Sequence, residues 1–177
     1  MRGSTRGAQS KQTADQKKGQ DKLIVSRSGG SRTAARVVGW IFFIVYIAAL
    51  VYFLFFAEGY GRVIDGAMHY NLEPFREIKR FLIHYDVLGW QAVVLNIIGN
   101  VVGFMPFGFF LPLLSAKERR LLMVLLLTFE LSLTVEVIQL FTGVGSFDVD
   151  DLILNTLGGV LGYGCYHLFS NLSKSFR

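Results

Sequence analysis

Residues 37–57 read VVGWIFFIVYIAALVYFLFFA, a run of 21 residues without a charged side chain. A helix rises about 1.5 Å per residue, so a run of this length crosses the roughly 30 Å hydrocarbon core of a bilayer. The preceding residues, 1–36, are polar and rich in Gly, Ser, Gln, Lys and Arg. A secretory signal instead has its short apolar core close to its start. The run therefore predicts an uncleaved membrane anchor, and it decides the fold class.

Three further apolar segments follow this anchor, at about residues 91–114, 121–141 and 151–169. The 177-residue chain is 52% hydrophobic, which favours a small integral membrane protein over a soluble domain. We therefore expect an all-α fold, an integral membrane bundle of four transmembrane helices. Its parts would be a disordered basic cytoplasmic tail (1–36), a transmembrane domain (37–170) and a short cytoplasmic tail (171–177).

Two prolines mark departures from regular spans. Pro106 lacks a backbone N–H, so we expect it to kink the second span or break it into two pieces. Pro74 precedes a stretch with Phe75, Ile78 and Leu82 at positions i, i+3 and i+7, opposite a charged face. Pro at the first helical position is favourable. This stretch predicts an amphipathic helix that either lies at the membrane interface or packs on the other spans.

The distribution of Lys and Arg predicts the orientation in the membrane. The N-terminal tail holds nine of them, the turn at 115–120 three and the C-terminal tail two, whereas the connection 58–90 holds four and the loop 142–150 none. Positive charge accumulates on the cytoplasmic side, so both termini are expected there. The net charge of +5 is then explained by the orientation of the chain in the membrane. We therefore expect the bilayer rather than nucleic acid as a partner.

Polar residues recur near the outer end of each of the last three spans. Polar groups are costly in hydrocarbon, so a shared depth suggests one buried polar site. Amides supply both donors and acceptors, as a polar headgroup or a peptide–sugar ligand requires. The candidate ligand-binding residues are Asn96, Asn100, Glu136, Gln139, Asp148, Asp151 and Asn155.

The third span carries two glutamates with different surroundings. Glu136 shares a helix face with Ser132 and Gln139, whereas Glu130 points about 120° away and lies near the membrane midplane. Each glutamate is expected to be protonated, hydrogen-bonded or reached by water. Glu136 is either a binding or proton-transfer group, or a partner in an interhelical hydrogen bond to Asn96 or Asn100.

Small residues and acidic residues suggest further contacts. The motifs Gly99-x-x-x-Gly103 and Gly158-x-x-x-Gly162 allow close helix packing, within the chain or in a dimer. The acidic run from Asp148 to Asp151 resembles a cation site, but calcium loops need more oxygen ligands and another spacing. Asp150 or Asp151 could instead favour the positive N-terminus of the fourth span. With one cysteine, Cys165, and no clustered metal ligands, we expect no metal and no cofactor.

The ordered set of motifs resembles the VanZ-like family of bacterial membrane proteins. It consists of Asn96-Ile-Ile-Gly-Asn100, Phe104-Met-Pro106-Phe-Gly108 running to Leu111-Pro112, Glu136-Val-Ile-Gln139, Phe147-Asp148-Val-Asp-Asp151 and Asn155-Thr-Leu-Gly158-Gly159. The family is named for a protein associated with resistance to teicoplanin-type glycopeptide antibiotics. The resemblance implies a multi-pass protein of the bacterial plasma membrane with a cell-envelope role.

Three functions remain open at this point, beside a purely structural bundle that would tolerate apolar replacement of Glu136 and Asn100. The first is a protein that binds a cell-wall precursor or another lipid-linked or glycopeptide-like ligand at the outer leaflet and modulates glycopeptide susceptibility. The second is a membrane enzyme that modifies a lipid-linked envelope substrate, with a buried glutamate for acid–base chemistry. The third is a small proton-coupled transporter that uses Glu130 and Glu136.

Overall fold

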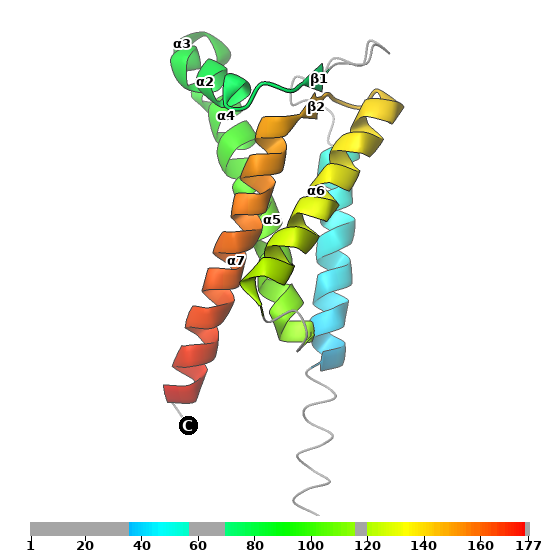
Figure 1. Cartoon of the computed structure of the whole chain (residues 1–177), viewed down its shortest axis with the longest axis vertical. Coiled ribbons are helices and arrows are strands. Elements are labelled where there is room, and N and C mark those ends of the chain that lie inside the picture. Colours follow the sequence, from blue (N-terminus) through cyan, green and yellow to red (C-terminus); the bar gives the residue numbers. More distant parts are fainter. Residues whose placement is uncertain (1–35, 57–69, 116–119, 176–177) are drawn as a thin grey trace, which may run out of the picture. The chain divides into compact units, whose positions relative to one another are not determined.

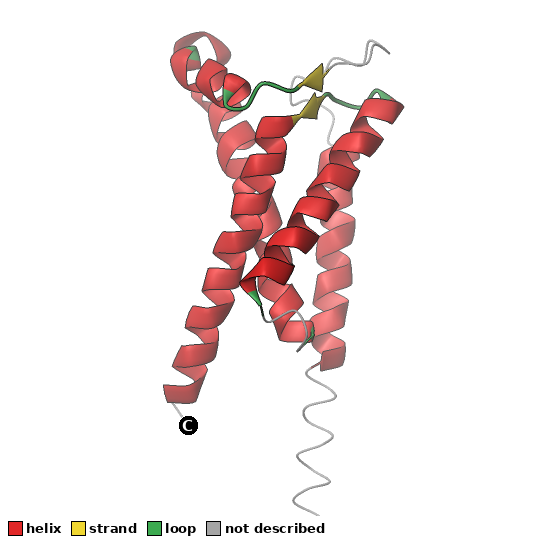
Figure 2. Ribbon diagram, viewed as in Figure 1, coloured by secondary structure: helices red, strands yellow, loops and turns green. Residues whose placement is uncertain are grey.

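The computed structural model describes residues 36–56, 70–115 and 120–175, and most of them are helical (Figure 2). The chain divides into two compact units, Met1–Ile41 and Phe42–Arg177. The expected disordered tail lies outside the described residues, apart from Arg36, which begins a helix. Residues 70–175 and residues 42–55 of the first helix lie in the second unit, and the contacts described below are within it. Figure 1 labels the helices and strands from residue 70 onward.

Three helices are long and apolar enough to cross a membrane. They cover Arg36–Phe55, Trp90–Leu114 and Leu121–Thr142 (α6). These bounds agree with three of the predicted spans to within two residues. The hydrophobic runs therefore suffice to locate these helices, and the prediction of a mainly helical membrane protein is confirmed.

The fourth predicted span corresponds to α7, Val149–Ser175. This helix has 27 residues, enough to span a bilayer by length, but it is less apolar than the other three. Its glycines, Asn155 and His167 interrupt the hydrophobic run. The fourth span therefore stays a prediction. Because α7 continues to Ser175, most of the predicted C-terminal tail is helical.

The helix Trp90–Leu114 has an irregular turn, but not at the predicted place. It consists of α4 (Trp90–Val93), the π-helical turn η1 (Val94–Ile98) and α5 (Gly99–Leu114). The break predicted at Pro106 is not confirmed, because α5 runs through Pro106 and Pro112. Prolines are tolerated in transmembrane helices where neighbours and local adjustments satisfy the freed carbonyl groups.

Between the first two spans lie α2 (Arg76–Ile83) and α3 (Tyr85–Leu88). The helix α2 begins two residues after Pro74, because Phe75 adopts a left-handed conformation with φ 65°. Pro74 therefore lies in the preceding turn, and its predicted place as the first helical residue is wrong. Leu82 and Ile83 are exposed rather than packed on the spans, which favours the interfacial alternative for this helix.

Two short strands, which the sequence did not predict, join distant parts of the chain. β1 (Tyr70–Asn71) pairs in parallel with β2 (Phe147–Asp148), with Asn71 opposite Asp148. Figure 1 shows this pair beside the start of α7 and at the same end of the helices as α2 and α4. The pairing brings the segment before α2 to the acidic run that begins α7.

Glycines allow α7 to pack most extensively on α5. A Cβ atom on Gly158 would overlap the carbonyl oxygen of Val101, and one on Gly162 would overlap that of Met105. Such contacts require glycine, because any side chain would force the helices apart. The Gly158–Gly162 motif is therefore used within the chain.

The other predicted glycine motif does not face α7. The Gly103 carbonyl accepts a hydrogen bond from the Tyr46 hydroxyl at 2.8 Å, so this residue faces the first helix. A Cβ atom on Gly99 would meet only Val94 of its own helix, at 4.0 Å. On α5 it is Gly108 that packs closely on α7, because a Cβ atom there would overlap the Gly159 backbone. Gly99 and Gly103 therefore do not bring α5 against α7.

Candidate functional site

The first part of the candidate site is the loop after α6. This loop folds back, so that Asp148 contacts Glu136 near the end of α6. Gly143 ends α6 in a left-handed conformation (φ 69°), and the chain then passes through β2 into α7. The backbone N–H of Asp148 donates to Oε2 of Glu136 at 2.9 Å. Glu136 is only 1% exposed, so this carboxylate anchors the start of α7 from inside the protein.

Asp148 extends this anchor to the segment before α2. Its Oδ1 accepts hydrogen bonds from Asn71 Nδ2 at 3.1 Å and from the Asp150 backbone N–H at 2.8 Å. Asn71 Oδ1 in turn accepts from the Glu73 backbone N–H at 3.2 Å, an arrangement typical of an Asx turn. Asp148 and Asn71 are both buried. The carboxylate therefore fixes two loops to each other.

Asp150 caps α2 although it belongs to another helix. Its Oδ1 accepts from the Phe75 backbone N–H, and its Oδ2 accepts from those of Glu77 at 2.8 Å and Ile78 at 3.1 Å. The first N–H groups of a helix have no partner in that helix, and an anion there also interacts favourably with the helix dipole. Asp150 is 1% exposed. We call Glu136, Asp148, Asp150 and Asn71 the buried acidic cluster.

A second polar group lies beside this cluster and is half-buried. Asn100, in the first turn of α5, donates from Nδ2 to Oδ1 of Asp151 on α7. One turn earlier, in the π-helical η1, Asn96 donates from Nδ2 to the Ala92 carbonyl at 2.9 Å. All three side chains are partly exposed. We call Asn96, Asn100 and Asp151 the polar patch.

The remaining two predicted site residues make contacts inside the bundle. Asn155 is buried and donates from Nδ2 to Ser132 Oγ at 2.9 Å, which joins α7 to α6. Gln139 is also buried and donates from Nε2 to the Leu54 carbonyl at 3.1 Å, which joins α6 to the first helix. These contacts connect helices. The Oδ1 atom of Asn155 is buried without a hydrogen-bond partner.

Burial and neighbouring carboxylates raise the pKa of two acidic residues, Asp148 and Glu77. Burial raises the pKa of the Asp148 carboxyl, although the donors from Asp150 and Asn71 oppose that shift; the nearby Asp150 charge adds to it. Burial also raises the pKa of Glu77 in α2, opposed by Arg80, whose guanidinium lies 3.0 Å from the Glu77 carboxylate. The charges of Asp148 and Asp150 add to the shift at Glu77. This end of the protein is therefore acidic, with Arg80 as a nearby positive charge.

The seven predicted residues gather at one end of α5, α6 and α7, but they do not form one continuous group. Glu136 meets Asp148 through a backbone N–H, and Asn100 meets Asp151. Sequence reasoning missed Asn71 as a member. It offered the N-terminus of the fourth span as one place for the Asp150 or Asp151 charge, and both residues lie in the first turn of α7. The contact of the Asp150 carboxylate with α2 was not predicted. The Asn71-Leu-Glu spacing, typical of an Asx turn, was the available signal for Asn71.

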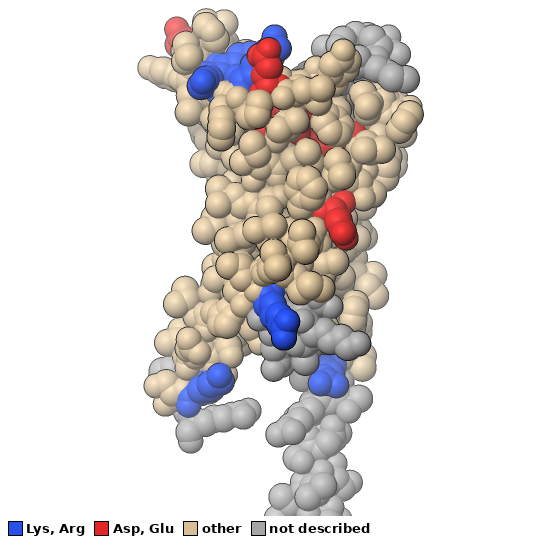
Figure 3. Space-filling view, in the orientation of Figure 1, with Lys and Arg blue, Asp and Glu red and all other residues tan. Residues whose placement is uncertain are grey.

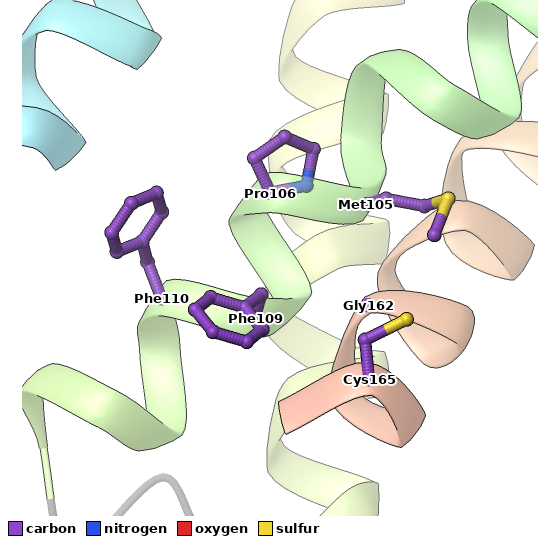
Figure 4. Close-up of a pocket in the computed structure, with 6 residues that line it drawn as sticks. All are labelled: Met105, Pro106, Phe109, Phe110, Gly162 and Cys165. Atoms are coloured by element: carbon purple, nitrogen blue, oxygen red, sulfur yellow. The ribbon is translucent and has the colours of Figure 1, made fainter. Parts of the chain in front are cut away.

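A separate apolar pocket of about 350 Å³ lies between α5 and α7, away from these residues. Figure 4 shows its lining, which consists of Met105, Pro106, Phe109, Phe110, Gly162 and Cys165. It contains none of the predicted site residues. Within the described part of the chain, no three His, Cys, Asp or Glu side chains are grouped as metal ligands.

The fold and site define a small helical membrane protein with an acidic polar site at one end of its spans. A family model described as VanZ/LLP1 matches residues 43–170. The chain is also 32% identical to Protein VanZ of Enterococcus faecium over 127 residues, which cover 70% of each protein. The chain therefore belongs to the VanZ/LLP1 family, as its motifs indicated. No solved structure matches it.

Proposed function

We propose that this protein binds the polar part of a lipid-linked or glycopeptide-like ligand through the polar patch, and that it thereby lowers susceptibility to teicoplanin-type antibiotics. The ligand would bind at the outer leaflet of the bacterial plasma membrane. The antibiotic class comes from the family resemblance, and membership of the VanZ/LLP1 family supports it. The buried acidic cluster would hold the patch in place.

The half-exposed pair of Asn100 and Asp151 carries this proposal. Polar pairs that only join helices can be buried, as Asn155 and Ser132 are. Asn100 and Asp151 instead remain partly exposed. Asn100 also follows a π-helical turn, a feature that is frequent at functional sites. Their amide and carboxylate groups can bind hydroxyl, amide or ammonium groups.

The charge distribution indicates which part of a ligand would face the patch. The carboxylates of Asp148, Asp150 and Asp151 disfavour a phosphate group nearby. We therefore place the sugar or peptide part of a lipid-linked ligand against the patch. The exposed basic residues Arg76 and Lys79 of α2 are better suited to face its phosphate groups.

The proposed topology has four spans, with α7 as the fourth and both termini in the cytoplasm. The low content of Lys and Arg at the end with α2 and the acidic cluster supports this orientation. Reporter fusions after Ser175 and within the loop 143–146 would test it. An extracellular signal from the C-terminal fusion would contradict the proposal.

The function is tested by measuring teicoplanin susceptibility in a sensitive Gram-positive host at matched membrane levels. The strains would carry empty vector, the intact protein, Asn100→Ala, Asp151→Asn, or Asp86→Asn. Asp86 is exposed in α3, so its variant makes the same charge change outside the patch. We expect reduced susceptibility with the intact protein and Asp86→Asn, and loss of most of this effect with both patch variants. If all variants reduce susceptibility equally, the polar patch is not the binding site. If the intact protein has no effect, the proposed role in teicoplanin susceptibility is wrong.

Glu136 is tested separately, because it supports the patch from inside. Glu136→Ala would leave the buried Asp148 N–H without its acceptor and would disturb the loop. Glu136→Gln keeps an acceptor oxygen and nearly the same volume, so we expect it to retain membrane levels and part of the activity. Mass spectrometry of envelope lipids from these strains separates binding from catalysis. A new lipid species that requires the intact protein would favour the enzyme alternative.

A further inference from the structure

Glu130 is an exposed carboxyl group halfway along a transmembrane helix. It is the tenth of the 22 residues of α6. Its side chain is exposed, as are those of Leu126 and Phe129. Among the described residues, no group hydrogen-bonds or ion-pairs with its carboxyl group; only its backbone carbonyl has a side-chain partner, the Thr134 hydroxyl at 2.7 Å. Figure 3 shows acidic atoms surrounded by uncharged surface between the two ends of the molecule.

The exposed carboxyl belongs to a regular stripe. The buried side of α6 includes Val124, Thr128, Ser132, Val135 and Gln139, and Glu130 lies on nearly the opposite side of the helix. The exposed face of α6 is broad and also includes Leu122, Phe129 and Ile138. Along its middle, exposed residues repeat at intervals of three or four. These residues, which we call the outer stripe of α6, are Met123, Leu126, Glu130, Thr134, Val137 and Phe141. Such spacing is typical of a helix that packs along a second helix.

A carboxyl group facing lipid is unfavourable. Lipid tails offer it no hydrogen-bond partner, and ionisable residues within spans almost always face other protein or water. Among the described residues, the Lys or Arg nearest to Glu130 along the chain is Arg120, just before α6. Arg120 lies ten positions before Glu130, about 15 Å along the helix, which is too far for an ion pair. The outer stripe therefore requires a partner that offers a polar group at the depth of Glu130.

We propose that the outer stripe of α6 is a dimer interface with a second copy of this chain, in which the two Glu130 side chains meet. Two copies inserted in the same orientation are related by a two-fold axis along the membrane normal, and a residue on such an axis faces its own counterpart. A second copy inserted in the same orientation therefore supplies a polar group at the required depth.

The local chemistry is self-complementary. A neutral carboxyl group both donates and accepts, so two of them can hydrogen-bond to each other. The Thr134 hydroxyl donates to its own helix and keeps its oxygen free to accept from the opposite Glu130. A single polar residue in an apolar seam also fixes the register of two helices.

Cysteine cross-linking in lipid vesicles tests the interface. Cys165 is exposed, so the full-length protein would first carry Cys165→Ala. A single cysteine would then be placed at Val137 in the outer stripe or, as a control, at Leu161 of α7, which is at least as exposed. After reconstitution at low protein density, we expect an oxidised dimer for Val137→Cys and little for Leu161→Cys. A monomer at both positions, or equal cross-linking at both, would overturn the interface.

The role of Glu130 is tested in the Val137→Cys protein. We expect Glu130→Leu to weaken association about threefold to thirtyfold, the range found for hydrogen bonds between transmembrane helices. Glu130→Gln keeps donors and acceptors and should retain the dimer. Circular dichroism and thermal unfolding would show that both variants are folded. Undiminished dimer in the folded Glu130→Leu variant would refute the pairing of the two carboxyl groups, and loss in both variants would refute the hydrogen-bond explanation.

Discussion

Replacing Asp150 should loosen α2 without unfolding the helical bundle. The Asp150 carboxylate accepts three backbone N–H groups of the first turn of α2, from Phe75, Glu77 and Ile78. In Asp150→Ala these donors lose their acceptor at once. The helices α5, α6 and α7 keep their own packing contacts, which do not involve this side chain.

The size of the effect follows from these contacts. Loss of a helix cap costs about 0.5–2 kcal/mol, and a hydrogen bond to a charged group contributes about 1.5–3 kcal/mol. Water can hydrogen-bond to some of the freed N–H groups at the exposed end of α2, which offsets part of this cost. We therefore expect the free energy of local unfolding of α2 to fall by about 2–3 kcal/mol. This change raises the equilibrium constant for opening of α2, and with it the rate of hydrogen exchange, roughly 30- to 150-fold.

Hydrogen exchange measured by mass spectrometry on the protein in lipid nanodiscs would show this change in peptides that cover residues 75–83. Asp150→Asn should have a smaller effect, because it keeps one acceptor oxygen but loses the charge. Asp86→Asn, an exposed charge change in the adjacent α3, is the control. If hydrogen exchange of these peptides in Asp150→Ala is less than about threefold faster than in the intact protein, the reasoning is refuted, because α2 is then held by the membrane surface and not by Asp150.

The glycine contacts and the Asp148 carboxyl give two further predictions. Gly162→Ala should separate α7 from α5 and lower the unfolding midpoint in detergent, whereas Gly164→Ala, with no atom within 4 Å of the new Cβ, should be neutral or stabilising by up to about 1 kcal/mol; equal midpoints would contradict the close packing. Because burial raises the Asp148 pKa, the folded state binds this proton more tightly than the unfolded state, so stability should rise as the pH falls through the raised pKa toward the ordinary value. Unfolding of the intact protein compared with Asp148→Asn between pH 7 and pH 4 measures this contribution. A stability difference that stays constant, or an intact protein that loses stability relative to the variant as the pH falls, would contradict it.

The sequence was sufficient to locate three of the four predicted spans but not to predict the contacts between the helices. A charge-free run such as residues 37–57 has one favourable environment, so its length and position locate a helix. Pro106 shows the limit of such reasoning. Its missing N–H is a local property, but whether a helix breaks depends on neighbours that satisfy the freed carbonyl. Gly99 and Gly103 show the same limit, because spacing identifies a close-packing surface but not the helix that meets it.

The site was predictable in its depth but not in its connections. Asn96, Asn100, Glu136 and the aspartates lie at corresponding ends of successive spans, so their gathering follows from threading the chain through a membrane. The capping of α2 by Asp150 depends on a contact between residues more than 70 positions apart. The short pairing of β1 with β2 creates that contact, and two-residue strands leave no periodic signal.

The buried and half-buried polar groups therefore have separable tasks. Glu136, Asp148 and Asp150 accept backbone N–H groups from β2, α7 and α2, so their charges are used to hold loops where they meet the helices. The glycines of α7 bring its backbone against α5, and this closeness places Asp151 within reach of Asn100. A ligand can replace or extend the contact between these two side chains without removing a buried acceptor. For this reason the polar patch, rather than the buried acidic cluster, is the part of the site that can exchange partners while the fold is retained.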